Sequence, residues 1–249
     1  MTGDKIRMHC AEIDRCNQRG GRMLSIVDLI DAGTMTRDLA AYSLAAISNG
    51  ASFMVGANPG GAGKTTVMGT LLNFVPPDVQ LVPAENIEII EQGQTNPEPR
   101  CCYICHEIGS GSYYAYLWGR ILHAYFDLPA FGHMLATNLH AGTFQEARQQ
   151  ICGDNQVSYA AFRHINLIFF LSVNRNRMHV SRKIVQVWES ANQSDHQPIF
   201  DTDRLNIMDS KLVTFAEFTH ACEDIDRITA SGARTIEETR DAFLETAAT

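Results

Sequence analysis

Short apolar runs alternate with amphipathic segments along most of the chain. The apolar runs predict strands at 52–57, 80–82, 101–106, 134–138, 167–171 and 184–188. Helical spacing and capping residues predict helices at 25–32, 36–49, 113–126 and 143–151, with one more after the glycine-rich run near residue 60. Strands that alternate with helices favour an α/β fold, in which a mostly parallel sheet carries helices on both faces.

The two ends of the chain depart from this alternation. Residues 1–24 are polar and basic and predict a loosely held N-terminal arm, so the folded domain is expected over residues 25–249. At the other end, two capping boxes begin at Thr214 and Thr235 and predict a small tail of C-terminal helices at about 212–247. The polar stretch 91–100 carries two prolines and predicts a loop.

Composition limits what the chain can do. Its 249 residues are 45% hydrophobic and 19% charged, enough to bury one full core. The net charge of −8 argues against nucleic acid as the main partner, because nucleic-acid binders usually carry a basic surface. No apolar run approaches the length of a membrane span, and no secretion signal is recognisable. Seven cysteines without disulfide-scaffold spacing predict the reducing cytosol.

The segment 55–66, VGANPGGAGKTT, lies between a predicted strand and a predicted helix. A glycine-rich loop in this position is typical of a phosphate-binding loop, where Lys64 reaches the β- and γ-phosphates and the Thr65 hydroxyl binds Mg²⁺. Asn58 replaces the usual first glycine, and asparagine tolerates left-handed backbone angles. The residues expected to bind ATP are Asn58, Gly60, Gly61, Ala62, Gly63, Lys64, Thr65 and Thr66. The segment predicts a nucleoside-triphosphate site.

Hydrolysis also needs a carboxylate near the γ-phosphate. Glu107 follows the apolar run 101–106, and strands of an open parallel sheet end at the ligand. We therefore expect Glu107 to orient the attacking water, with a surface glutamate at a strand terminus as the alternative.

Three cysteines in the same strand suggest a second chemistry. Cys102 and Cys105 form a C-x-x-C pair followed by His106, which raises a zinc or redox site. No second cysteine pair follows at zinc-finger spacing, and alternate residues of a strand point to opposite faces. Buried thiols that fill the core are the favoured interpretation.

Several segments, in order, resemble the ATPase domain of the type II and type IV secretion-system and pilus-assembly ATPases, in their archaeal form. The resemblance extends over roughly 25–245. Besides the phosphate-binding loop, it includes LVPAEN at 81–86, similar to the family's acidic box, and HEIG at 106–109, similar to its atypical Walker B. The segment GHMLATNLHA at 132–141 is similar to the family's His box and is the most specific of the matches.

The resemblance implies a RecA-like P-loop NTPase, reduced to its motor domain, that uses ATP and Mg²⁺. It implies that Glu107 is the catalytic carboxylate, that Glu85 holds Mg²⁺ through water, and that His133 and His140 sense the γ-phosphate. The implied partners are further copies of the chain, as in a hexamer, and membrane-bound secretion or pilus components. The implied location is peripheral, at the cytoplasmic face of a membrane.

The chain departs from this family in its arginines. Those between the acidic box and Walker B are reduced to Arg100, and Gly109 replaces the arginine that usually follows Walker B. Such arginines accelerate phosphoryl transfer by several orders of magnitude, so their loss puts the hexamer and fast hydrolysis in question. The candidate substitutes are Arg120, Arg148 and Arg163. Two functions stay open: an ATP-hydrolysing motor, and a nucleotide-binding regulatory or structural subunit with little hydrolysis. A third, a P-loop protein that acts on DNA, is disfavoured by the acidic net charge.

Overall fold

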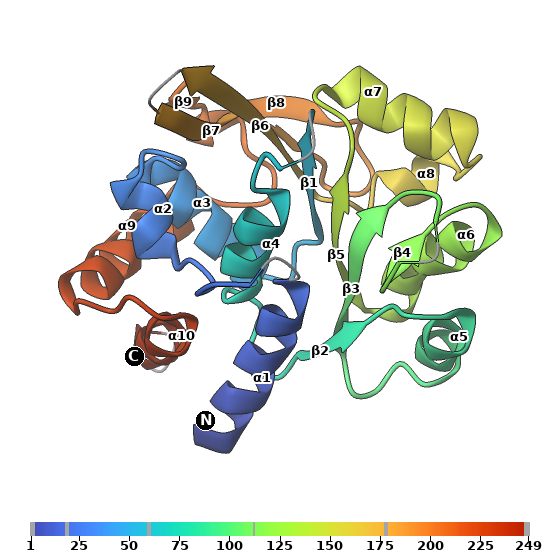
Figure 1. The fold of residues 1–249 in the computed structure, drawn as a ribbon, viewed down its shortest axis with the longest axis horizontal. Helices are drawn as coiled ribbons and strands as arrows, with labels where there is room; N and C mark the ends of the chain where they lie inside the picture. Colours follow the sequence, from blue (N-terminus) through green and yellow to red (C-terminus); the bar gives the residue numbers. More distant parts are fainter. Residues whose placement is uncertain (1–2, 18–19, 59–60, 112, 177–178, 247–249) are drawn as a thin grey trace.

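A sheet with helices on both sides forms the centre of the molecule (Figure 1). The computed structural model describes residues 3–17, 20–58, 61–111, 113–176 and 179–246. The strands within this part of the chain are β1 (Phe53–Ala57), β2 (Gln80–Pro83), β3 (Cys101–Ile108), β4 (Tyr116–Leu117), β5 (Met134–Leu139), β6 (Leu167–Asn176), β7 (His179–Glu189), β8 (Gln197–Asp201) and β9 (Arg204–Leu205). All six predicted strands are confirmed, while β4, β8 and β9 had no clear apolar signal.

The sheet is parallel in its centre and antiparallel along one side. The strand order is β2-β3-β5-β1-β6-β7-β8-β9, and β4 pairs with the C-terminal end of β3. The pairs from β2 to β6 are parallel, and those from β6 to β9 are antiparallel. The predicted mostly parallel α/β fold is therefore confirmed. Because β5 lies between β1 and β3, the loops that follow these three strands meet at one edge.

Two helical layers cover the two faces of the sheet (Figure 1). One layer contains α1 (Gly3–Cys16), α2 (Ile26–Asp31), α3 (Arg37–Ser48), α4 (Lys64–Leu72), α9 (Phe215–Ala230) and α10 (Ile236–Thr246). The other contains α5 (Ile87–Thr95), α6 (Arg120–Asp127), α7 (Phe144–Arg148) and α8 (Tyr159–Phe162). Strand residues alternate between the layers: Phe53 and Val55 pack into the first core, and Met54 packs into the second.

Helix α1 corrects the expectation of a loosely held arm. Ile6, Cys10, Ile13 and Cys16 recur at helical spacing, and all four are buried against the first layer. His9 Nε2 also lies 3.1 Å from the carbonyl oxygen of Leu72, near the end of α4. The expectation is wrong for residues 3–16, because polar residues on the other faces of the helix conceal a narrow apolar stripe.

The two predicted C-terminal helices are present as α9 and α10, and both pack into the core. The Thr214 hydroxyl caps the N-terminus of α9, and the Glu217 carboxylate accepts the Thr214 backbone N–H, so the predicted capping box is confirmed. Ile225 and Ile228 of α9 and Phe243 of α10 are buried in the first core. These two helices complete the layer that contains α4.

Two local predictions are wrong. The predicted loop 91–100 is helical as far as Thr95, because the Asn86 side chain caps α5 by accepting the Ile89 N–H at 2.9 Å. The predicted helix 113–126 begins only at Arg120, after strand β4 and after Gly119, which has a positive φ of 68°. None of the described helices combines the length and the apolar character that a bilayer span requires.

Candidate functional site

The candidate site lies at the carboxyl edge of the parallel strands. The loop after β1 leads directly into α4, which begins at Lys64. Glu107 is near the end of β3, and His140 directly follows β5. Three segments that are distant in the sequence are thus placed side by side by the strand order, with β5 between the other two.

The glycine loop has the backbone that its sequence predicts. Gly61 and Gly63 have positive φ angles of 82° and 95°, which residues with a side chain rarely adopt. Gly63 is the N-cap of α4, so the unpaired N–H groups of the first helical turn are available to an anion. At the other end of the loop, the Asn58 side chain donates to Glu146 Oε2 at 3.1 Å. Gly60, which was expected to bind phosphate, lies outside the described residues.

Lys64, Glu107 and His140 form one cluster, in which Lys64 and Glu107 are buried and His140 is half exposed. Lys64 Nζ lies 3.3 Å from Glu107 Oε2 and 3.3 Å from His140 Nδ1. His140 Nε2 lies 3.7 Å from Glu107 Oε2. Since Lys64 is the donor, the proton of the neutral His140 ring is on Nε2, on the side of the carboxylate. The structure therefore brings together three of the residues predicted from the sequence.

A bulge in β3 aims two consecutive side chains at the same space. Cys105 pairs with Thr137 and Ile108 with Leu139, so β3 contains one residue more than β5 in this interval. The Asn138 amide secures the bulge by donating to the His106 carbonyl oxygen at 2.8 Å. In a regular strand His106 and Glu107 would point to opposite faces, whereas here both line the same cavity.

Burial sets the protonation of the cluster. Removal from water raises the pKa of Glu107, and the neighbouring Lys64 partly offsets this rise. Burial, and then Lys64, lowers the pKa of His140, which favours the neutral ring. Among the described residues, Glu107 Oε1 is buried and has no hydrogen-bond partner. An unpaired carboxylate oxygen of this kind can accept a hydrogen bond from water or bind a cation.

A cavity of about 630 Å³ opens beside the cluster, within the size range of small-molecule sites. Gly61 to Thr66 form one wall, and Glu107 and His140 form another. The lining also includes Arg22, His106, Tyr116 and Arg182, none of which was predicted as a site residue. These come from the connection after α1, from the bulge, from β4 and from the β6–β7 ribbon. His106 belongs to the HEIG segment, and no local motif marks the other three.

Two predicted residues lie apart from the cluster. Glu85 follows β2 and accepts a hydrogen bond from the Tyr114 hydroxyl at 2.6 Å; it does not line the cavity. His133 directly precedes β5, at the opposite end of that strand from His140. There His133 Nδ1 accepts the Cys101 N–H at 3.1 Å and Nε2 lies 3.0 Å from the Gly93 carbonyl oxygen. The structure does not bring His133 to the site.

The arginines proposed from the sequence also lie elsewhere. Arg148 stacks on the Tyr159 ring, with its guanidinium carbon 4.6 Å from the ring centre. Arg163 donates to the Gln193 carbonyl oxygen at 3.1 Å, and Arg100 donates to that of Gly132 at 3.0 Å. Neither these residues nor Arg120 line the cavity, whereas Arg22 and Arg182 do.

The C-x-x-C pair is divided between the two cores. Cys102 packs into the first core, and Cys101 and Cys105 pack into the second. All three thiols are buried, and burial raises the pKa of Cys105 to about 12. The interpretation of these cysteines as core residues is confirmed.

No protein-family model matches the chain, and no curated protein matches its sequence. Among solved structures, it is similar to the VirB11 ATPase of the Brucella suis type IV secretion system, determined in complex with sulphate. That match has 18% identity and a TM-score of 0.46, and covers 65% of this chain and 54% of the other. The Yersinia pseudotuberculosis ATPase DotB matches at 10% identity and a TM-score of 0.45, covering 88% and 62%. The chain thus spans about half to three fifths of these two structures.

Proposed function

We propose that this chain binds ATP with Mg²⁺ in the cavity lined by residues 61–66 and hydrolyses the γ-phosphate. The observation that carries the proposal is the convergence of Lys64, Glu107 and His140 beside a glycine loop at the start of a helix. A cation, a buried carboxylate and a helix N-terminus together are what the charge and the chemistry of a triphosphate require.

In this mechanism the loop N–H groups and Lys64 bind the phosphate oxygens. Glu107 accepts a hydrogen bond from a water molecule and aligns it with the terminal phosphorus. The water oxygen forms a bond to that phosphorus, and the bond to the bridging oxygen breaks with its electron pair on ADP. Glu107 receives the proton that the water loses. His140 is neutral and contacts both Lys64 and Glu107. When the γ-phosphate binds Lys64, His140 transmits the resulting change in position to Glu107.

The donor set also fits Mg²⁺, which prefers oxygen ligands. Thr65 lines the cavity and its hydroxyl is the direct ligand in this proposal, whereas Glu85 lies outside the cavity lining and is not assigned to the ion. The bound ion would neutralise charge on the phosphate oxygens. Thr66 and the other loop residues hold the phosphates.

The wider role rests on the ordered sequence segments that resemble secretion and pilus-assembly ATPases. On that basis the chain is a motor subunit that forms homo-oligomers, a hexamer in the simplest case, and acts on membrane-bound export or assembly components at the cytoplasmic face. Light scattering with and without ATP tests the assembly. A monomer under all conditions would remove the oligomer from the proposal.

Steady-state phosphate release tests the enzymatic claim. We expect turnover by the wild type, loss of ATP binding in Lys64→Ala, and ATP binding with at least about 100-fold slower turnover in Glu107→Gln. The matched controls are Lys211→Ala and Glu91→Gln, two exposed residues outside the cavity. Wild-type turnover no faster than that of both site variants, with ATP still bound, would instead support a regulatory or structural nucleotide-binding subunit.

A further inference from the structure

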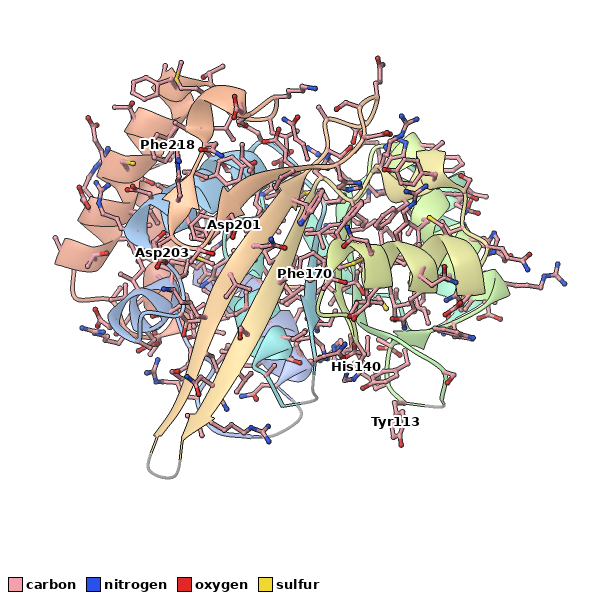
Figure 2. All side chains as sticks on the ribbon, turned by 90° about the horizontal axis from the view of Figure 1, so that it is seen from above. Tyr113, His140, Phe170, Asp201, Asp203 and Phe218 are labelled. Carbon is pink, nitrogen blue, oxygen red and sulfur yellow. The ribbon has the colours of Figure 1, made fainter. Side chains whose placement is uncertain are left out.

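The β6–β7 ribbon brings an arginine from a distant part of the sequence to the candidate site. Strands β6 and β7 pair along their whole length, and the two strands extend past the rest of the sheet on the side of His140 (Figure 2). Val180, Ser181 and Arg182, near the start of β7, line the same cavity as the glycine loop. No motif in the sequence marks this ribbon as part of a nucleotide site.

A second bulge decides which side chain of the ribbon faces the cavity. Phe170 pairs with Gln186 but Leu171 pairs with Ile184, so Val185 is an extra residue in β7. The side chains of Val187 and Ile184 are both in the first core, although three positions separate them. Arg182 lies two residues before Ile184 and pairs with Val173. Because alternate residues of a strand share a face, Arg182 is on the same face as Ile184, the face that carries α4. Without the extra residue, Lys183 would occupy this position.

Arg182 lies directly over the start of α4. A Cβ atom added at Gly63 would lie 3.0 Å from Arg182 Cδ and 3.5 Å from its Nε. Gly63 is the N-cap whose following N–H groups face the phosphate position. The absence of a side chain at Gly63 thus allows the arginine stem to cross the loop, with the guanidinium beside the anion site.

The other arginine that lines the cavity, Arg22, is already paired with a carboxylate. Arg22 makes two hydrogen bonds to the Asp28 carboxylate, at 2.7 and 3.0 Å. Arg182 is exposed, and it takes part in none of the ion pairs found within the described part of the chain. Among the described residues, no carboxylate therefore competes for its guanidinium, and its stem lies close to the glycine loop.

We propose that Arg182 is a catalytic residue that acts within its own subunit by donating hydrogen bonds to the terminal phosphate of ATP. This inference rests on the function proposed above. The positive charge of Arg182 would stabilise the charge that gathers on the γ-phosphate oxygens during transfer. Arg182 would thus provide, within the same chain, the positive charge that the arginines near Walker B usually provide. It acts through hydrogen bonds and makes no covalent bond.

Comparison of Arg182→Ala, Arg182→Lys and wild type tests the proposal. We expect Arg182→Ala to lower kcat at least about 100-fold with less than about tenfold change in KM, and Arg182→Lys to recover part of the loss. ADP affinity should change less than about threefold, because ADP lacks the phosphate that Arg182 contacts. The controls are Arg175→Ala and Lys183→Ala on the same ribbon; neither residue lines the cavity.

Each outcome bears on the proposal in one direction. Turnover of Arg182→Ala within threefold of wild type, or an equal loss in Arg175→Ala, overturns it and leaves the proposed function intact. If the wild type binds ATP without turnover, the readout is the ratio of affinities for a non-hydrolysable ATP analogue and ADP. A tenfold fall of that ratio in Arg182→Ala supports the proposal, and an unchanged ratio overturns it. A wild type that binds no nucleotide overturns both.

Discussion

Lys64 Nζ and Glu107 Oε2 lie 3.3 Å apart, and both side chains are less than one tenth exposed. The pair links the residue that should bind phosphate to the residue that should activate water. A triphosphate that draws Lys64 towards its own oxygens would leave Glu107 with less of its compensating charge. The carboxylate would then become a stronger base when the substrate is in place.

The raised pKa of Glu107 predicts the acid limb of the activity. Glu107 acts as a base only when ionised, so kcat/KM should be constant above this pKa and fall as the pH drops through it. We expect the midpoint above the ordinary glutamate value. In Lys64→Ala the cause that lowers the pKa is gone, so the Glu107 carboxyl resonance in an NMR titration should move to a still higher pH. A midpoint at or below the ordinary value would contradict this account of the site.

Gly63→Ala should damage the site, beyond its cost to stability. A residue with a side chain at this positive φ costs about 1–2 kcal/mol of unfolding free energy. The new Cβ would also meet the Arg182 stem at 3.0 Å. Gly232→Ala is the matched control, since Gly232 has a positive φ of 76° and open space around it. Urea denaturation should show similar losses for both variants, and ATP titration should show weaker binding for Gly63→Ala alone.

The two histidines of the predicted His box should separate stability from activity. His133→Ala leaves the buried Cys101 N–H and Gly93 carbonyl unpaired, so it should lose about 2–4 kcal/mol of unfolding free energy at unchanged kcat. His140→Ala should lower kcat with little change in stability, since His140 is half exposed and contacts Lys64. Denaturation and phosphate-release measurements check both variants. A lower kcat with unchanged stability in His133→Ala would contradict this prediction and support a catalytic role for His133.

Helix α1 should contribute to global stability. Ile13 is fully buried, and Ile13→Ala should cost about 2–4 kcal/mol in urea denaturation. Met8 on the same helix is 71% exposed, so Met8→Ala should change the unfolding free energy by less than about 0.5 kcal/mol. Equal, small effects of the two variants would restore the loosely held arm that the sequence predicts.

Local sequence was enough for features that depend on neighbouring residues. Apolar runs located six strands, and the glycine loop between β1 and α4 follows from a motif whose positive φ angles need glycine. Capping boxes located α9, and the acid after an apolar run identified Glu107. The packing of α1 was not predicted, because its few isoleucines and cysteines lie on one narrow face and polar residues on the other faces make the segment polar on average.

The sequence by itself determined that this chain is an α/β protein with a glycine-rich loop typical of phosphate binding and a carboxylate near the end of a neighbouring strand. Only the tertiary structure decided which residues share the site. The order β3-β5-β1 brings His140 between Glu107 and Lys64 and leaves His133 at the far end of β5. Two bulges turn Glu107 and Arg182 towards the cavity. Strand order and register depend on contacts between distant segments, so no local pattern encodes them.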